Sequence, residues 1–340
     1  AGAQVVDASL WCVGPGTSVN AIARSGNTLY IGGSFGSVGP STGAGAPVDV
    51  KDGAPAGPYP AVAGDVATVV ADGSGGWFVG GAFAGVGGFP RRNLAHILAD
   101  GAVADWNPSP DGTIVALAMS GNTLYVGGDF WQIGGEARRS LAAFDVSTGH
   151  VTAWDPEPGA GGPTGSEYGT VWAILPRGHN VYVGGSFASI GGESRMNLAA
   201  LDAKTGTATA WNPGADSGIR ALAIHGNTLF AGGLFVHMGE QLRTYLAAID
   251  LGTGAATPWD ARVSRVPEDY NYDGGPRVLA LQVLGNTLYV AGAFSEIGGQ
   301  PRASLAALDI KTGAATSWDP QAHGWGTEDP ARPYFNTLVV

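Results

Sequence analysis

The stretch "TIVALAMSGNTLYVGGDFWQIGGEARRSLAAFDVSTGHVTAWDP", residues 113–156, contains four short apolar segments, each followed by a turn signal. The segments cover 113–119, 122–128, 140–146 and 150–156. Apolar and polar positions alternate within them, and β-branched and aromatic residues are frequent, which predicts β-strands. A Gly-Asn pair at 121–122 fits a tight hairpin, and Gly149 can take the positive φ that a hairpin turn needs. The stretch therefore predicts one antiparallel sheet of four strands.

The same phrase returns along the chain. Its G-G-x-F part, or A-G-A-F in the last copy, ends at Phe35, Phe83, Phe130, Phe187, Phe235 and Phe294. The repeats are about 48 residues long, with about ten extra residues in two of them. Four antiparallel strands in each such unit, repeated around a ring, are typical of an all-β fold of the β-propeller type. A solenoid is the alternative, but its repeats are usually shorter and it needs distinct capping ends.

The repeats divide a single domain, residues 1–340, into six complete units. We expect these blades over 18–60, 64–107, 112–155, 169–212, 218–260 and 275–319. Further strands are expected near the ends of the chain, over 4–11, which resembles a fourth strand, and over 334–340, which resembles a first strand. Two arrangements fit. One is a seven-bladed ring whose truncated last blade is split between the termini. The other is a six-bladed ring with two extra strands, and the usual way in which rings close favours seven.

The phrases "GNTLYVGGDF" (121–130), "IGGEARRSLAAFD" (133–145) and "TAWDP" (152–156) resemble the bacterial delta-60 and Kelch-like β-propeller repeats of exported and cell-surface proteins. The resemblance covers nearly the whole chain and is weakest over 36–62. It implies a propeller and a secreted or cell-surface location. It says almost nothing about chemistry, because propellers carry many functions.

The composition excludes several classes of function. The formal net charge is −11, with only 17 Lys and Arg, and no basic run is present, so we expect no nucleic-acid partner. No stretch of 18 apolar residues predicts a membrane-spanning helix, and we expect no membrane insertion. Cys12 is the only cysteine, so the chain forms no internal disulfide. Many Gly and Trp residues with few lysines are typical of exported bacterial proteins.

Charged and aromatic residues that recur in every unit are predicted to be structural. The Asp residues that close the third strands, and the Arg residues that follow a G-G pair, are expected to bond to nearby loops or neighbouring blades, because one ligand seldom needs five equivalent contacts. The Trp residues that end the fourth strands are expected to pack between blades, with a carbohydrate platform as the alternative. These residues are Asp145, Asp202, Asp250, Asp309, Arg91, Arg138, Arg195, Arg243, Arg302, Trp106, Trp154, Trp211, Trp259 and Trp318.

Variable residues are expected on one face only. In a four-stranded blade, the second-to-third and fourth-to-first loops share a face, and here these are the long ones; function usually lies on variable loops held by a rigid scaffold. Acidic and aromatic insertions occur at 155–169, 260–275 and 319–333. The candidate ligand-binding residues of this long-loop face are Trp131, Tyr168, Tyr270, Tyr272, His323 and Trp325, and the second-to-third loops add His237 and Met238.

One insertion contains "DYNYDG" (269–274), the start of a calcium-loop pattern. Asp269, Asn271 and Asp273 would supply oxygen ligands for Ca²⁺, and Gly274 would allow the turn. The twelfth position is Ala280 instead of the usual Glu. The alternative is a solvated acidic turn, which short Asp, Asn and Gly runs commonly form.

No H-E-x-x-H or C-x-x-C motif occurs. The sequence therefore predicts an exported, non-catalytic propeller that binds a protein or glycan partner through the long-loop face, as a module of a larger surface protein or assembly. The alternative is a carbohydrate-active hydrolase or lyase that uses a carboxylate pair, Glu157 with Glu167 or Glu328 with Asp329, on the same face.

Overall fold

The computed structural model describes residues 18–34, 44–49, 59–159, 169–264 and 275–320. These residues form strands and turns, and all strand pairs are antiparallel. No helix occurs in this part of the chain, so none is present there that could cross a membrane. The all-β prediction is confirmed, while the predicted terminal strands 4–11 and 334–340 and Cys12 lie outside the described residues.

Six larger sheets follow one another along the chain, and we number them in that order. In each, the first strand pairs with the second and the second with the third. Sheet 1 contains β1 (Ser18–Ser25), β2 (Thr28–Ser34) and β3 (Gly45–Asp49); sheet 2 contains β4 (Val62–Ala71), β5 (Trp77–Val86) and β7 (Leu94–Ile97); sheet 3 contains β8 (Thr113–Ser120), β9 (Thr123–Asp129), β12 (Leu141–Asp145) and β13 (His150–Val151); sheet 4 contains β14 (Thr170–Arg177), β15 (Asn180–Ser186) and β18 (Leu198–Asp202); sheet 5 contains β19 (Ile219–His225), β20 (Thr228–Gly233) and β23 (Leu246–Asp250); sheet 6 contains β24 (Arg277–Leu284), β25 (Thr287–Ala293) and β28 (Leu305–Asp309).

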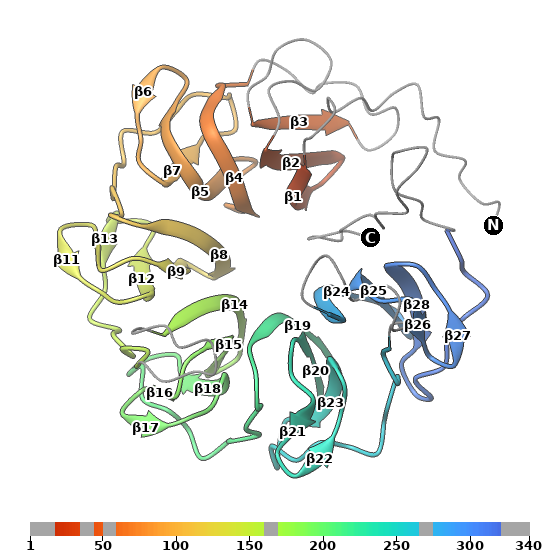
Figure 1. Cartoon of the computed structure of the whole chain (residues 1–340). Coiled ribbons are helices and arrows are strands. Elements are labelled where there is room, and N and C mark those ends of the chain that lie inside the picture. The colour runs from red at the N-terminus through yellow and green to blue at the C-terminus, as the bar shows by residue number, and fades with distance from the viewer. Residues whose placement is uncertain (1–17, 35–43, 50–58, 160–168, 265–274, 321–340) are drawn as a thin grey trace.

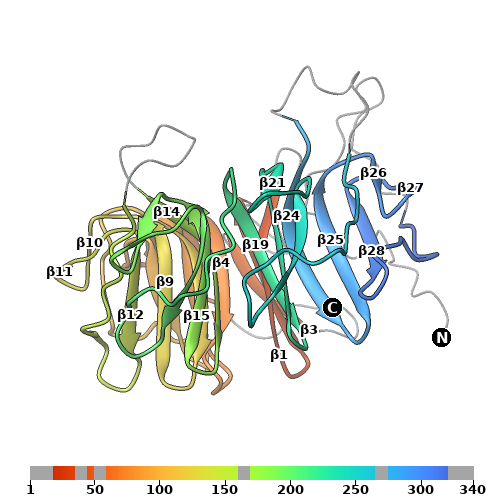
Figure 2. The ribbon, with the colours of Figure 1, turned by 90° about the horizontal axis from the view of Figure 1, so that it is seen from below.

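The sheets are arranged around a common axis, with the first strand of each sheet innermost (Figure 1). Neighbouring first strands contact one another in the order β1, β4, β8, β14, β19 and β24. Viewed from the side, the strands run between two faces of the molecule (Figure 2). The apolar core lies between neighbouring sheets: Tyr125 of sheet 3, for example, belongs to one buried cluster with Val171 and Val181 of sheet 4.

The loops between second and third strands contain short hairpins that the sequence did not predict. Four are separate two-stranded sheets, and in sheet 2 a short strand instead pairs with the end of β5. In sheets 2, 3, 4 and 6 a second Gly pair provides the turn, and in sheet 5 Gly239 and Glu240 do. In sheet 3, Gly134 and Gly135 have φ of 63° and 81° and so fit a hairpin turn with two positive φ values. The strands are β10 (Gln132–Ile133), β11 (Glu136–Ala137), β16 (Ser189–Ile190), β17 (Glu193–Ser194), β21 (His237–Met238), β22 (Gln241–Leu242), β26 (Glu296–Ile297), β27 (Gln300–Pro301) and β6 (Phe89–Pro90).

The predicted fourth strands are much shorter than expected. The segment 150–156 is a strand only over His150–Val151, and in sheets 2, 4, 5 and 6 a single bridge replaces it, for example between Leu201 and Ala208. A backbone hydrogen bond from Thr209 to Ala200 still holds this segment against its third strand. The segment then leaves the sheet, because the Trp that ends it packs toward the next sheet.

This Trp joins neighbouring sheets through its indole N–H. Trp154 Nε1 donates to the Asp202 carbonyl of sheet 4 at 3.0 Å, and its ring meets Tyr125 edge to face. Trp106 and Trp211 make the same bond to the turn of the following sheet, at 2.8 and 3.1 Å. We call this contact the Trp latch. It confirms for Trp106, Trp154 and Trp211 that these tryptophans pack between sheets. Trp259 Nε1 is buried without this bond, and Trp318 is 41% exposed.

The side chains of the recurrent Arg and Asp residues also form hydrogen bonds within the fold. Arg195 donates from Nη1 to the Ser194 carbonyl and from Nη2 to the Thr209 carbonyl, and equivalent pairs of bonds occur at Arg91, Arg138, Arg243 and Arg302. Asp202 Oδ1 accepts the N–H groups of the next turn, and these bonds hold the pKa of its carboxyl below the ordinary value. The structural interpretation of these repeated charges is confirmed.

Candidate functional site

The two kinds of long loop meet on one face, as predicted. In sheet 3, Asp111 Oδ1 of the fourth-to-first segment accepts the N–H groups of Trp131 and Gln132, at 2.8 and 3.0 Å. In sheet 5, Asp216 Oδ1 accepts the N–H of Val236 at 2.9 Å. Each acidic side chain therefore fixes the hairpin that follows the second strand.

The first two residues after each G-G-x-F phrase, or the A-G-A-F of sheet 6, stand on this face, and we call them the loop rim. The second of them starts the short hairpin in sheets 3 to 6, so its backbone is the same in each sheet. Its side chain differs every time. The loop rim consists of Trp131–Gln132, Ala188–Ser189, Val236–His237 and Ser295–Glu296.

His237 of the loop rim lies within ion-pair distance of Asp216. Their Nδ1 and Oδ2 atoms are 2.9 Å apart, and the side chains are 50% and 42% exposed. Burial alone would raise the pKa of Asp216, but the hydrogen bonds from His237 and Val236 outweigh it and lower that pKa. The carboxylate orients the imidazole, which can then donate or accept a hydrogen bond. No cluster of three His, Cys, Asp or Glu side chains suited to a metal occurs among the described residues.

Trp131, like His237 and Met238, is a predicted residue of this face that the structure describes. Its side chain is 40% exposed on the loop rim, and the Arg139 guanidinium lies 4.8 Å from the centre of its ring. The stacked cation holds the indole in place. Its exposure is consistent with a role in binding.

A groove lies on the same face between sheets 5 and 6. Its volume is about 500 Å³, within the size range of small-ligand sites. Ser264 donates to Glu296 Oε2 at 3.0 Å on one wall, and the exposed Arg262 stands on another beside Asp260. The groove thus combines both charges with the apolar side chains of Leu242 and Pro301.

The remaining predicted residues divide into two groups. Tyr168, Tyr270, Tyr272, His323 and Trp325, and the calcium ligands Asp269, Asn271 and Asp273, lie outside the described residues. Met238 was expected on the functional face, and this is wrong: it is 1% exposed because the hairpin turns its side chain into the core of sheet 5.

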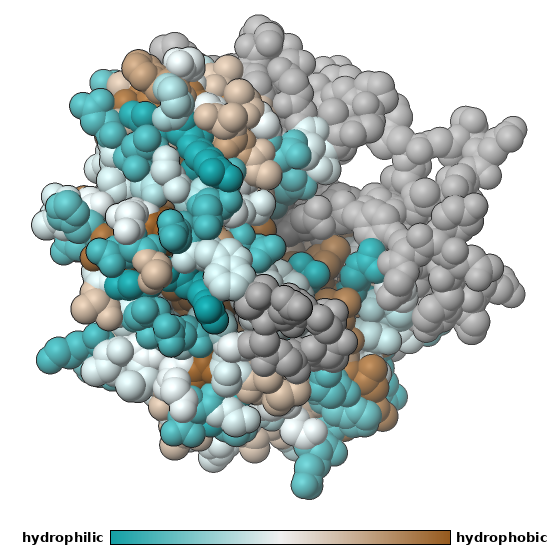
Figure 3. Space-filling view, turned by 60° about the vertical axis from the view of Figure 1, so that its left-hand side comes forward, coloured by the Kyte–Doolittle hydropathy of each residue, from teal (hydrophilic) through white to brown (hydrophobic). Residues whose placement is uncertain are grey.

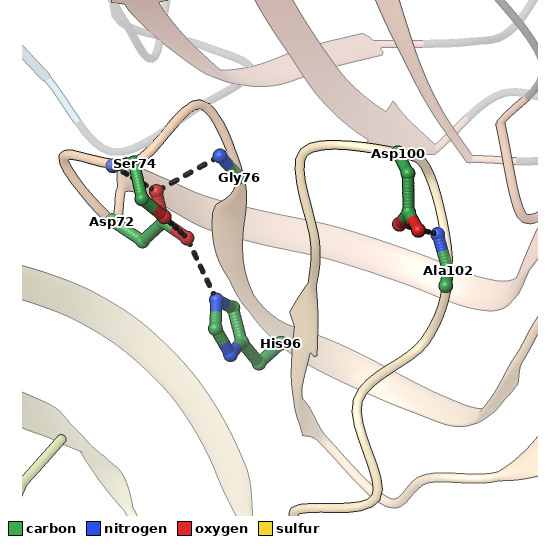
Figure 4. Close-up of polar contacts among 6 residues, drawn as sticks. All are labelled: Asp72, Ser74, Gly76, His96, Asp100 and Ala102. Atoms are coloured by element: carbon green, nitrogen blue, oxygen red, sulfur yellow. Dashed lines mark hydrogen bonds and ion pairs between the residues drawn. The ribbon is translucent and has the colours of Figure 1, made fainter. Parts of the chain in front are cut away.

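The sequence analysis missed a second Asp–His pair, on the short-turn face (Figure 4). His96 Nε2 lies 2.9 Å from Asp72 Oδ2, and Asp72 also accepts bonds from Ser74 and from the Gly76 N–H. His96 stacks on Phe78, with ring centres 4.2 Å apart. Two departures from the repeat were the available signals: His96 replaces the Ala of other third strands, and Leu98 replaces the Asp that caps them.

The Asp72→Asn variant measures how much the Asp72–His96 pair contributes to the free energy of unfolding. Burial raises the pKa of Asp72, but the bonds from His96, Ser74 and Gly76 bring it below the ordinary value. A lowered folded-state pKa stabilises the protein above the unfolded pKa, about 3.9, and this gain is lost as the pH falls through the folded pKa. We expect the parent to exceed the variant by about 1–3 kcal/mol at pH 7. Urea unfolding at pH 7, 5, 4 and 3 should show the difference shrink below about pH 4.

The matched control is Asp100→Asn, because Asp100 accepts one N–H, from Ala102, in a neighbouring exposed turn (Figure 4). It should change the free energy of unfolding by less than about 0.5 kcal/mol. An equal loss in the two variants, or a loss at Asp72 that does not depend on pH, would contradict the account.

No protein-family model matches the chain, and no curated protein is similar to it in sequence. Among solved structures, the chain is similar to the computationally designed Ika8 protein, with a TM-score of 0.50 and 16% identity over 88% of this chain and 86% of that one. The computationally designed Ika4 protein aligns with a TM-score of 0.34 and 18% identity, over 59% of this chain and 92% of that one, and this second likeness supports no argument. The likeness to Ika8 concerns the fold alone.

Proposed function

We propose that the chain is a β-propeller of the delta-60 and Kelch-like kind, and that it binds a protein or glycan partner through its long-loop face without catalysing a reaction. The arrangement of sheets 1 to 6 around one axis supports the ring (Figure 1). The repeat phrases, quoted above, support the family and an exported or cell-surface location. In this proposal the module belongs to a larger surface protein or assembly.

A seventh blade split between 4–11 and 334–340 would close the ring. Its support is the sequence, because 4–11 resembles a fourth strand and 334–340 resembles a first strand. An experimental structure should show 4–11 and 334–340 paired in one blade, and their placement in different blades would contradict this closure.

The binding function is supported by a contrast between recurrent residues, whose side chains bond within the fold, and the variable residues of the loop rim. Recurrent Arg, Asp and latch Trp residues form hydrogen bonds within the fold. The loop rim presents Gln132, Ser189, His237 and Glu296 at equivalent hairpin positions, with Trp131 next to Gln132, so the fold does not require any one of these side chains. Conformationally fixed backbones with variable side chains are the usual arrangement of a binding surface.

The visible surface of sheets 2 to 4 is consistent with a polar partner. Figure 3 shows hydrophilic and weakly polar side chains over most of it, with apolar ones in small separate spots. Binding that relies on aromatic anchors set among polar groups suits carbohydrates and the polar rims of protein partners.

The test is a binding screen of the purified chain on arrays of glycans and of secreted proteins. We expect Trp131→Ala with His237→Ala to lower the affinity for any selected partner at least tenfold. The control is Lys204→Ala with Lys311→Ala, in the exposed turns of the short-turn face, which should change it less than twofold. Equal losses in the two double variants would contradict the assignment of the face.

A second candidate, a carbohydrate-active hydrolase or lyase, is favoured by one observation. The Asp216–His237 pair is exposed on sheet 5, which also forms one side of the groove. The carboxylate orients the imidazole, which can then act as a base. The sequence pairs Glu157 with Glu167 and Glu328 with Asp329 include residues outside the described part of the chain. Incubation with the glycans that bind should release reducing ends, and His237→Ala should stop that release, if the enzyme is correct.

Calcium binding at Asp269, Asn271 and Asp273 remains a proposal that rests on the sequence pattern. Carboxylates crowded in one loop repel one another, so a bound Ca²⁺ would stabilise the folded chain by mass action. After chelation, millimolar calcium should raise the melting temperature, and Asp269→Ala with Asp273→Ala should abolish the rise. No response of the parent protein would show that the loop is only an acidic turn.

A further inference from the structure

Each first strand contains a β-bulge at the same place. The register shifts between Val19 and Ala21 in β1, and at the corresponding position in β4, β8, β14, β19 and β24. Bulges re-aim side chains and are common next to binding sites. The bulged residues, which we call the bulge ring, are Asn20, Ala67, Val115, Trp172, Arg220 and Leu279.

The bulge ring varies while its neighbours do not. In sheets 3 to 6 a buried Val or Ile precedes the bulged residue and an almost buried Ala follows it. The flanking positions therefore supply the core, and the bulged position does not. The first strands, and with them the bulged positions, are innermost in the arrangement of the sheets (Figure 1). Variation on a fixed backbone points to binding.

Two members of the bulge ring contact each other across neighbouring sheets. The Arg220 guanidinium lies 3.5 Å from the centre of the Trp172 ring. A Cβ on Gly218 would lie 2.5 Å from Cζ3 of Trp172, so this glycine makes the room that the indole needs. The stacked ring holds the guanidinium in one position, which lowers the entropy that a ligand must remove on binding.

The Arg220 guanidinium is available to a ligand. None of the ion pairs between described residues involves Arg220, and its side chain is exposed. An exposed cation held on an indole, in a chain of net charge −11, favours an anionic ligand.

We propose that Trp172 and Arg220 form an oxyanion site that recognises the carboxylate or sulfate of an acidic sugar. The inference rests on the proposed function, because both residues lie near the ends of first strands that meet the fourth-to-first loops, and it names the ligand of that face. Arginine forks bind oxyanions through two parallel hydrogen bonds. The neighbouring indole and Leu279 offer apolar contact to the C–H surface of a sugar ring, which a bare ion would not use.

Isothermal titration with digalacturonate tests the site directly. We expect Arg220→Gln to weaken binding at least tenfold and Arg220→Lys to weaken it by a smaller factor, because the ammonium keeps the charge but loses the stacked fork. The matched control is Arg177→Gln, which removes the same charge at the opposite end of β14, where Arg177 donates to the Gly226 carbonyl. It should leave the affinity within twofold. Galactobiose, which lacks the carboxylates, should bind at least tenfold more weakly than digalacturonate.

Competition by inorganic sulfate and phosphate tests whether the site recognises an acidic sugar or any free anion. Either ion should compete with digalacturonate at Arg220 but bind at least tenfold more weakly; equal affinities would overturn the sugar part of the proposal. Equal digalacturonate affinity in the parent and Arg220→Gln would overturn the site, and the melting temperature of each variant shows that it is folded. If a partner loses affinity for the loop-rim variants but binds Arg220→Gln as well as the parent, the proposed function is supported and this site is not. If digalacturonate binding depends on Arg220 but the screen of glycans and secreted proteins selects no partner, the site is supported and the proposed function is not.

Discussion

Trp154→Ala is expected to lower the free energy of unfolding by about 3–5 kcal/mol, the usual cost of truncating a buried Trp. The indole is 4% exposed, meets Tyr125 edge to face, and donates to the Asp202 carbonyl of the next sheet. Its removal leaves a cavity between sheets 3 and 4 and takes one of two donors from the Asp202 carbonyl, which still accepts the Gly206 N–H. Urea unfolding followed by circular dichroism measures the loss. We also expect the affinity for any ligand of the long-loop face to stay the same.

Trp318→Ala provides the matched control, because Trp318 occupies the same repeat position and meets Tyr289 edge to face, but is 41% exposed. Its removal should cost about 1 kcal/mol or less, since little of the ring is withdrawn from water. Equal losses at the two positions would contradict the latch as a source of stability. So would a change in ligand affinity at unchanged stability for Trp154→Ala.

Gly185→Ala is expected to cost about 4 kcal/mol or to prevent folding, a large effect for one methyl group. Gly185 faces the bulge of β14, and an added Cβ would overlap the Thr170 carbonyl oxygen and lie 3.0 Å from the Val171 Cα. Both are backbone atoms, so no side chain can move aside. The strands β14 and β15 would have to separate and lose hydrogen bonds along the sheet. The melting temperature and the yield of soluble protein measure the effect.

Gly192→Ala separates this overlap from the strain of glycine replacement in general. Gly192 has a φ of +82°, which disfavours alanine, but a Cβ there meets no atom within 4 Å. Its replacement should cost only about 1–2 kcal/mol. A larger loss at Gly192 than at Gly185 would contradict the close approach of β14 and β15 as the reason for the glycine at 185.

Much of the repeating unit could be predicted from the sequence because its information is local. Strands such as Thr123–Asp129 and Leu141–Asp145 have clear alternation and flanking turn residues. Two-residue strands such as Gln132–Ile133 contain no period to detect. The fourth strands were overestimated because the apolar residue that ends them serves the next sheet rather than its own.

The sites were harder to predict because their partners are distant in sequence. Trp131 could be found from its place in a variable loop. Trp172 and Arg220 belong to different repeats, and only the register shift, which leaves no mark in composition, brings them to one surface. Asp72 and His96 are joined by pairing between β5 and β7, so the dyad appears only once the sheet is built.

The latch also sets the order in which the chain can be completed during synthesis. Trp154 leaves the ribosome 48 residues before the carbonyl that its indole binds, and Trp211 leaves 39 residues before its own acceptor. Since translation proceeds from the N-terminus, each of these two units keeps one apolar ring uncovered until its successor emerges. A ribosome that stalls within such a unit therefore exposes a tryptophan to chaperones until the next 39 to 48 residues have been made.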